Sequence, residues 1–159
     1  MQKDITKLQK QVKESSSIDV IDAEIQDRLQ RSSNLIVYGV DANVVSSDSS
    51  KINSLLGKIN NLNLINISCK RTGKHKDNRP APLLVKLNSK EDVIRVLKNK
   101  SLLPQGISVS SDKTKLQRDN LHSLYSEVDR HNNSNSNKKA VKFINGIPTI
   151  VSKVSGNNE

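Results

Sequence analysis

Aromatic side chains are scarce in this chain. There is no Trp, and Tyr38, Tyr125 and Phe143 are the only Tyr or Phe residues among 159. A protein that reads unpaired bases by stacking uses several exposed rings, so we expect any nucleic-acid binding to rely on the phosphate backbone and to tolerate different sequences. The core must be built from Leu, Ile and Val. Tyr125 shares its helical spacing with Leu121 and Val128, which predicts that it belongs to that core.

Cysteine and long apolar runs are also nearly absent. Cys69 is the only cysteine, which excludes a disulfide framework and the paired-cysteine spacing of zinc sites. A lone cysteine indicates an intracellular, reducing compartment, and we expect Cys69 to be a small core residue. No stretch approaches the roughly 18 apolar residues of a membrane helix, and the N-terminal residues lack the apolar run of a signal peptide. We therefore expect no membrane partner.

Signatures of catalysis and of cofactor binding are missing as well. The sequence has no nucleophile–base pair, no phosphate-binding glycine loop and no metal-ligand spacing. His75, His122 and His131 are dispersed, without an acidic or Cys partner at ligand spacing. Three acidic residues are interpreted as caps or turn residues rather than general acids, namely Asp48, Asp92 and Asp112. We therefore expect no enzyme activity, no metal and no cofactor.

Positive charge is what the chain has in excess. The formal net charge is +10 at pH 7, yet residues 1–32 hold six cations and six acids, so the rest of the chain carries the whole excess. The balanced N-terminal block is typical of an association element, and the remainder of a basic globular body. Such a body favours a polyanionic partner.

Residues 1–32 are predicted to form a coiled-coil helix. Residues 2–31 contain no Gly or Pro, and apolar residues follow heptad spacing in two sets separated by three serines at 15–17. We expect these apolar residues to mediate self-association: Ile5, Leu8, Val12, Ile18, Ile21 and Ile25. The step of six residues from the first set to the second indicates either a coiled coil with a discontinuity or two short helices. A surface helix packed on the body is the alternative.

Residues 33–111 are predicted to form an α+β domain of the ferredoxin-like plan. Apolar runs with β-branched residues predict four strands, at 34–40, 66–71, 82–87 and 107–111. The first run is continuously apolar, which suits a strand covered on both faces. Apolar residues at helical spacing predict one helix between the first two strands, which Asp48 or Ser49 can cap. They predict a second helix between the last two strands, which Ser89 can cap. The resulting β-α-β-β-α-β order is that of an RNA-recognition motif.

Residues 112–152 are predicted to form a small second domain. An amphipathic helix over 113–131 is followed by a polar link and by two short strands around Asn145-Gly146, which is a type I′ hairpin signal. A helix plus a hairpin is too small to be stable alone. Residues 153–159 are predicted to be a disordered tail.

A dense cationic loop, KRTGKHKDNR at 70–79, is the leading candidate binding site. Mobile cations attract a phosphate backbone, and the candidates are Lys70, Arg71, Lys74, Lys76 and Arg79. Lys113, Lys115 and Arg118 flank the start of the C-terminal helix, where backbone N–H groups also favour anions. Solvated surface is the alternative reading of both groups, and a role for Lys138, Lys139 and Lys142 is left open.

Three segments of the chain resemble the first-open-reading-frame protein of LINE-type non-LTR retrotransposons. They are NLIVYGV, RTGKHKDNRPAPLLVKLNSKEDVIRVLKNK and ISVSSDKTKLQRDNLHSLYSEVDRHN, and the similarity runs from about Arg31 to Val151. The resemblance implies a trimeric coiled coil, an RNA-recognition-motif domain and a small C-terminal domain. It also implies sequence-tolerant binding of single-stranded RNA and DNA with nucleic-acid chaperone activity, in a cytoplasmic or nuclear ribonucleoprotein.

The resemblance also assigns roles to particular residues. Binding in that family uses basic residues in a cleft between the two small domains and at the coil junction. The matching positions here are Arg31, Arg71, Lys74, Lys76, Arg79 and Arg118. Ile36, Pro82 and Leu84 stand where RNA-recognition motifs carry stacking rings. A coiled-coil adaptor that binds proteins and no nucleic acid is the second hypothesis.

Overall fold

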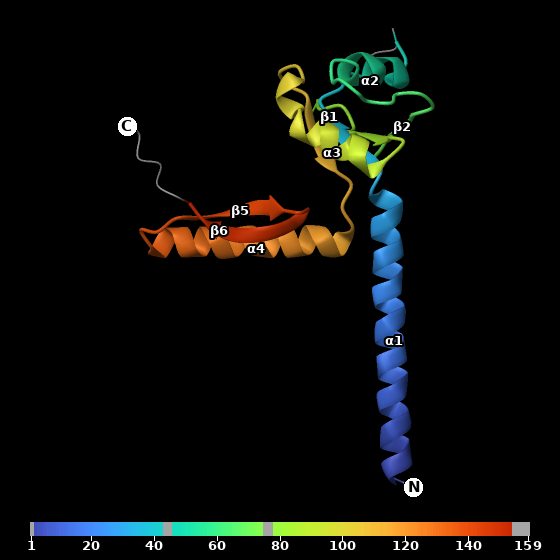
Figure 1. The fold of residues 1–159 in the computed structure, drawn as a ribbon, viewed down its shortest axis with the longest axis vertical. Coiled ribbons are helices and arrows are strands. Elements are labelled where there is room, and N and C mark those ends of the chain that lie inside the picture. Colours follow the sequence, from blue (N-terminus) through green and yellow to red (C-terminus); the bar gives the residue numbers. More distant parts are fainter. Residues whose placement is uncertain (1, 43–45, 75–77, 154–159) are drawn as a thin grey trace. The chain divides into compact units, whose positions relative to one another are not determined.

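A computed structural model describes residues 2–42, 46–74 and 78–153. The chain is α+β, with a long N-terminal helix followed by a small antiparallel sheet and further helices (Figure 1). It divides into two compact units, 1–112 and 113–159. The elements of the first unit are α1 (Gln2–Arg31), β1 (Asn34–Tyr38), α2 (Asp48–Leu56), β2 (Ser68–Arg71), β3 (Leu83–Lys86), α3 (Lys90–Lys98), the 3₁₀ turn η1 (Lys100–Leu102) and β4 (Ser108–Ser111). Those of the second are α4 (Lys115–Ser134), β5 (Lys139–Ile144) and β6 (Ile147–Ser152).

Helix α1 is continuous through the three serines. Without Gly or Pro to interrupt it, the helix absorbs them, and the Ser16 hydroxyl donates to the Lys13 carbonyl at 2.9 Å. The alternative of two short helices is therefore wrong. All six residues of the predicted association stripe are exposed, so they do not pack on the body of the unit. Their burial by another copy of the chain stays a prediction.

The four-stranded sheet has the order β2-β3-β1-β4, with every neighbouring pair antiparallel. Alternate residues of the central strands are fully buried, namely Leu35, Val37, Leu83 and Val85. They form one core with Ile52 and Leu56 of α2 and with Val93 and Val96 of α3, so both helices cover the same face of the sheet. The residues between them lie on the other face because successive side chains of a strand alternate.

We call that other side the open face of the sheet. The prediction that the first strand is covered on both faces is wrong, because among the described residues of the first unit α2 and α3 pack against only one face of the sheet. The pairing aligns Ser68, Lys86 and Asn34 in one row of the open face and Lys70, Leu84, Ile36 and Ser110 in the next. Tyr38, opposite Ser108, is exposed on the same side. An apolar run in one strand does not reveal that its neighbours place Lys and Ser beside it.

Caps and one glycine define the ends of these elements. Ser47, rather than Asp48 or Ser49, caps α2 by accepting from the Ser50 amide, whereas Ser89 caps α3 as predicted. Gly39 follows β1 with a φ of 85°, and a Cβ there would lie 2.0 Å from the Gly106 carbonyl oxygen. Only glycine fits this close approach of two backbones.

The second unit packs α4 along the β5–β6 hairpin (Figure 1). Thr114 and Gln117 form a reciprocal capping box at the start of α4. Asn145 and Gly146 have φ values of 51° and 79°, which confirms the predicted turn because type I′ needs positive φ at both positions. The prediction that Tyr125 is buried is wrong: it is 47% exposed, whereas Val128, one turn further along α4, is buried.

Candidate nucleic-acid interface

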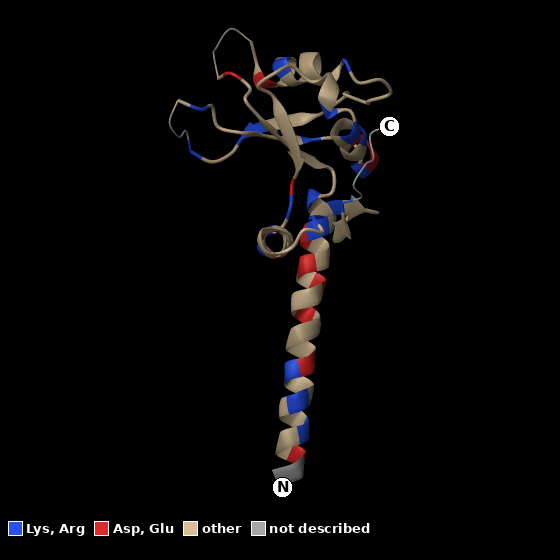
Figure 2. Ribbon diagram, turned by 90° about the vertical axis from the view of Figure 1, so that its left-hand side faces the viewer, with Lys and Arg blue, Asp and Glu red and all other residues tan. Residues whose placement is uncertain are grey.

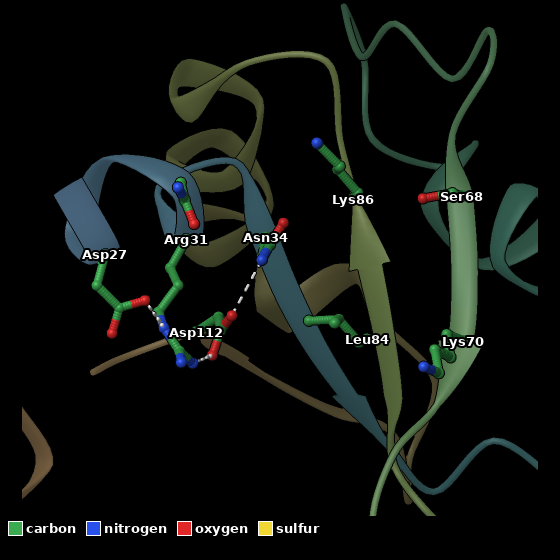
Figure 3. Close-up of a pocket in the computed structure, with 9 residues that line it drawn as sticks. Asp27, Arg31, Asn34, Ser68, Lys70, Leu84, Lys86 and Asp112 are labelled. Carbon is green, nitrogen blue, oxygen red and sulfur yellow. Dashed lines mark hydrogen bonds and ion pairs between the residues drawn. The ribbon is translucent and has the colours of Figure 1, made fainter. Parts of the chain in front are cut away.

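A hollow of about 560 Å³ lies where the end of α1 meets the open face of the sheet. The side chains around it are polar or charged apart from one leucine, and they come from α1, from β1 to β3 and from the residue after β4 (Figure 3). They are Asp27, Gln30, Arg31, Asn34, Ser68, Lys70, Leu84, Lys86 and Asp112. The surface at the base of α1 is therefore concave and rich in hydrogen-bonding groups.

Two lysines of the hollow have no intramolecular partner among the described residues. Lys70 on β2 and Lys86 on β3 are both exposed, and they flank Leu84 on the open face (Figure 3). Lys70 was predicted from the basic loop, whereas Lys86 was missed. The signal for Lys86 was its two-residue spacing from Leu84, which the alternation of a strand places on the same face. An ammonium without a partner can bind an anion without first breaking an ion pair.

Arg31, the predicted cation of the coil junction, is already paired. Its Nε donates to Asp27 at 2.7 Å and its Nη1 to Asp112 at 3.0 Å, and hydrogen bonds to these carboxylates raise its pKa, with Asp27 contributing most. Asp112 also accepts from the Asn34 amide at 3.0 Å. This network ties the last turn of α1 to β1. Any contact of Arg31 with phosphate would have to compete with two carboxylates.

Arg71, the predicted neighbour of Lys70 in phosphate binding, uses all its donors inside the protein. Its guanidinium contacts both oxygens of Asp48 at 3.0 and 2.6 Å in a bidentate pair. It also donates to the carbonyls of Val40 and Ala81, both at 2.8 Å, and of Asp41 at 2.9 Å. Arg71 thus joins β2, the start of α2 and two loops. A structural role accounts for its charge without a ligand.

Asp48 is the acidic partner of Arg71. The hydrogen bond from Arg71, more than any other effect, holds its pKa below the ordinary value. Burial raises the pKa of the neighbouring Cys69 thiol, which packs against the core. A thiol with a raised pKa is a poor nucleophile at neutral pH. Asp48 thus serves as the partner of Arg71, and Cys69 as part of the packing around the core.

The remaining loop cations extend from the end of β2. Lys74 and Arg79 are exposed, Lys74 has no partner among the described residues, and Lys76 lies outside them. Figure 2 shows Lys and Arg in this loop between β2 and β3, in contrast to α1, where Lys and Arg occur together with Asp and Glu. The loop is therefore the more strongly positive of the two regions.

The predicted cations of the second unit lie at the start of α4. Lys115 pairs with Asp119 at 2.6 Å, which lowers the pKa of Asp119. Arg118 donates to the Lys113 carbonyl, and the Lys113 ammonium lies 5.9 Å from the centre of the Phe143 ring. The expectation that cations of both units share one cleft stays a prediction.

Comparison with known proteins adds no assignment to this geometry. Within the described part of the chain, no group of three His, Cys, Asp or Glu residues could hold a metal ion. None of the described helices is long and apolar enough to cross a membrane. No protein-family model matches the chain, and neither does any curated protein.

Proposed function

We propose that the protein binds single-stranded nucleic acid on the open face of its sheet. The observation that carries this proposal is the pair Lys70 and Lys86, two lysines without partners among the described residues, beside a hollow of about 560 Å³. They can hold successive phosphates, while Asn34 and Ser68 offer hydrogen bonds to sugars or bases. Because Lys contacts phosphate as a point charge, binding is expected to tolerate different sequences.

The order of the strands supports assigning the first unit to the RNA-recognition-motif plan. The elements follow β1-α2-β2-β3-α3-β4, and the two central strands of the sheet are β3 and β1. Modules of that plan bind single strands on the sheet face that the helices leave open. Together with the resemblance to LINE-type first-open-reading-frame proteins, this supports a role as a retrotransposon nucleic-acid chaperone.

The dependence of affinity on salt tests the proposal. Each phosphate neutralised on a single strand contributes roughly −0.7 to the slope of log affinity against log salt. The double variant Lys70→Gln/Lys86→Gln should therefore flatten the slope by about 1.4 for oligo(U) and for mixed sequences alike. Binding that is insensitive to salt, or a loss confined to one sequence, would contradict the proposal.

A matched control separates local contacts from net charge. Lys58 and Lys98 are exposed near the ends of α2 and α3, the helices on the covered face of the sheet. The variant Lys58→Gln/Lys98→Gln removes the same charge, and its slope should stay close to that of the parent protein. Equal flattening by both double variants would assign the effect to overall charge and not to the open face.

We also propose that α1 assembles copies of the chain, as a trimer, so that weak contacts add by avidity. The support is the exposed apolar stripe, which includes Ile21 and Ile25. Ile21→Glu should shift the protein to monomer in sedimentation velocity. Val20→Glu is the matched control, since Val20 is also exposed but lies off the stripe. A parent protein that is already monomeric would contradict the proposal.

The same stripe favours the alternative function of a coiled-coil adaptor that binds proteins and no nucleic acid. The two functions differ in a filter-binding test with poly(U) at low and moderate salt. Retention that falls with salt supports nucleic-acid binding, and no retention at either concentration supports the adaptor.

A further inference from the structure

The tip of the β5–β6 hairpin carries a cluster of exposed apolar side chains. Phe143, Ile144 and Ile147 are 51%, 50% and 66% exposed and adjoin the Asn145-Gly146 turn, with Ile144 directly opposite Ile147. Ile144 and Ile147 project from one face of the hairpin and Phe143 from the other, because side chains alternate along a strand. We call these three exposed side chains at the tip the apolar patch. One of them is the only Phe of the chain. Exposed apolar side chains grouped in this way are typical of a binding site.

The charges around the patch select an anionic occupant. The Lys113 ammonium lies 5.9 Å from the centre of the Phe143 ring, a cation–π distance that keeps a positive charge beside the ring. Lys142 precedes Phe143 on β5 and has no partner among the described residues. Residues 113–159 hold eight Lys or Arg and four Asp or Glu, so the whole unit is positive.

A single strand of nucleic acid matches both features of the patch. Its bases present flat π faces to a half-exposed ring, and its phosphates carry the negative charge that the lysines favour. Lys142 and Phe143 project to opposite faces of the hairpin. Because β5 is an edge strand of a two-stranded sheet, a chain that passes round this edge meets both side chains.

We propose that Phe143 stacks on an unpaired base while Lys113 and Lys142 contact the flanking phosphates. This inference rests on the proposed function and adds to it a base-dependent contact in the second unit. The open face of the sheet would supply affinity through charge. The stacking contact of Phe143 would need a base to be present, but it would accept any base because every base has a π face.

The experiment compares two ligands of equal charge. Binding of an oligo(dT) and of an abasic oligonucleotide of the same length is measured for the parent protein and for Phe143→Leu, which keeps an apolar side chain but removes the ring. We expect binding of oligo(dT) to weaken about fivefold or more, and binding of the abasic strand to stay unchanged. An equal loss for both ligands, or a loss for neither, would overturn the stacking contact.

A second variant keeps the test informative if Phe143→Leu disturbs the hairpin. The chain has no Trp, so Phe143→Trp introduces a single reporter whose emission a stacked base quenches. Tyr125→Trp, on α4 of the same unit, is the matched control. Quenching of the Phe143→Trp variant by oligo(dT) is expected, without quenching by the abasic strand and without quenching of the Tyr125→Trp variant. Equal quenching of both variants, or of neither, would overturn the proposal.

Two further outcomes separate this inference from the proposed function. If the parent protein binds neither oligonucleotide, the proposed function fails and the stacking contact fails with it. If both oligonucleotides bind with equal affinity and Phe143→Leu changes neither, the proposed function stands and only the stacking contact is lost. A change in sedimentation of Phe143→Leu without nucleic acid would assign the ring to a contact between copies instead.

Discussion

The two faces of the four-stranded sheet are built from the same strands but differ in burial and in residue type. On the covered face, Leu35, Val37, Leu83 and Val85 are fully buried beneath α2 and α3. On the open face, the intervening positions carry lysines, serines, an asparagine and a tyrosine beside Ile36 and Leu84. Because side chains alternate along a strand, one short segment presents apolar side chains to the core and other side chains to the open face.

Lys70 and Arg71 show this division at the scale of two residues. Both are cations at the start of the basic loop, and both were predicted to contact phosphate. Lys70 lies on the open face without a partner among the described residues, whereas Arg71 projects to the helix side, where Asp48 and three carbonyls accept its hydrogen bonds. Adjacent like charges therefore differ in their intramolecular partners, because they lie on different faces of the sheet.

The largest difference in stability between variants of the two faces is expected for neighbouring leucines of β3. Leu83→Ala should lower the free energy of unfolding by about 3 kcal/mol, since Leu83 is fully buried and its truncation leaves a cavity. Leu84→Ala, on the open face, should cost about 1 kcal/mol or less. Urea denaturation followed by circular dichroism measures both variants. Equal losses would contradict the assignment of the two faces.

A smaller difference is expected between Arg71 and Lys70. Arg71→Ala should lower the free energy of unfolding by about 2–3 kcal/mol, because it leaves Asp48 and three carbonyls without their donor. Lys70→Ala should change it by no more than about 0.5 kcal/mol. The same denaturation measurement applies. If Lys70→Ala were the more destabilising variant, the structural role of Arg71 would be refuted.

The free energy of unfolding at acidic pH should depend on the Asp48–Arg71 ion pair. The pKa of Asp48 is lowered in the folded state from the ordinary 3.8, so its contribution is fully present above that value and is lost as the pH falls through the lower folded-state pKa. Asp48→Asn should remove this pH dependence of stability. It should also lower the free energy of unfolding by less than Arg71→Ala does. Denaturation midpoints from about pH 2 to about pH 6 test this, and an unchanged profile would contradict it.

The smallest effect on stability is expected for Lys86. Lys86→Ala should leave the free energy of unfolding within about 0.5 kcal/mol of the parent value, because the side chain is exposed and has no partner among the described residues. It should nevertheless flatten the salt dependence of oligo(U) binding by about 0.7. A stable variant with an unchanged slope would remove Lys86 from the proposed interface.

Much of the local structure was predictable from short patterns. The cap at Ser89, the positive-φ turn at Asn145-Gly146 and the four strands of the first unit depend on neighbours a few residues away. Cys69 was also expected to lie inward, and its two-residue spacing from Arg71 already indicated that Arg71 shares that side. The partners of Arg71 could not be predicted, because they come from loops at 40–41 and 81 and from the start of α2.

Local pattern and charge thus account for which segments become helices and strands, and for the positive character of the body. Long-range packing accounts for which of those charges remain available. Lys86 lies near Lys70 because β2 pairs with β3. Arg71 is not available to a ligand because Asp48, at the start of α2, forms an ion pair with it. The reason is physical: backbone preferences act over a few residues, whereas ion pairs and burial depend on contacts between segments far apart in the chain.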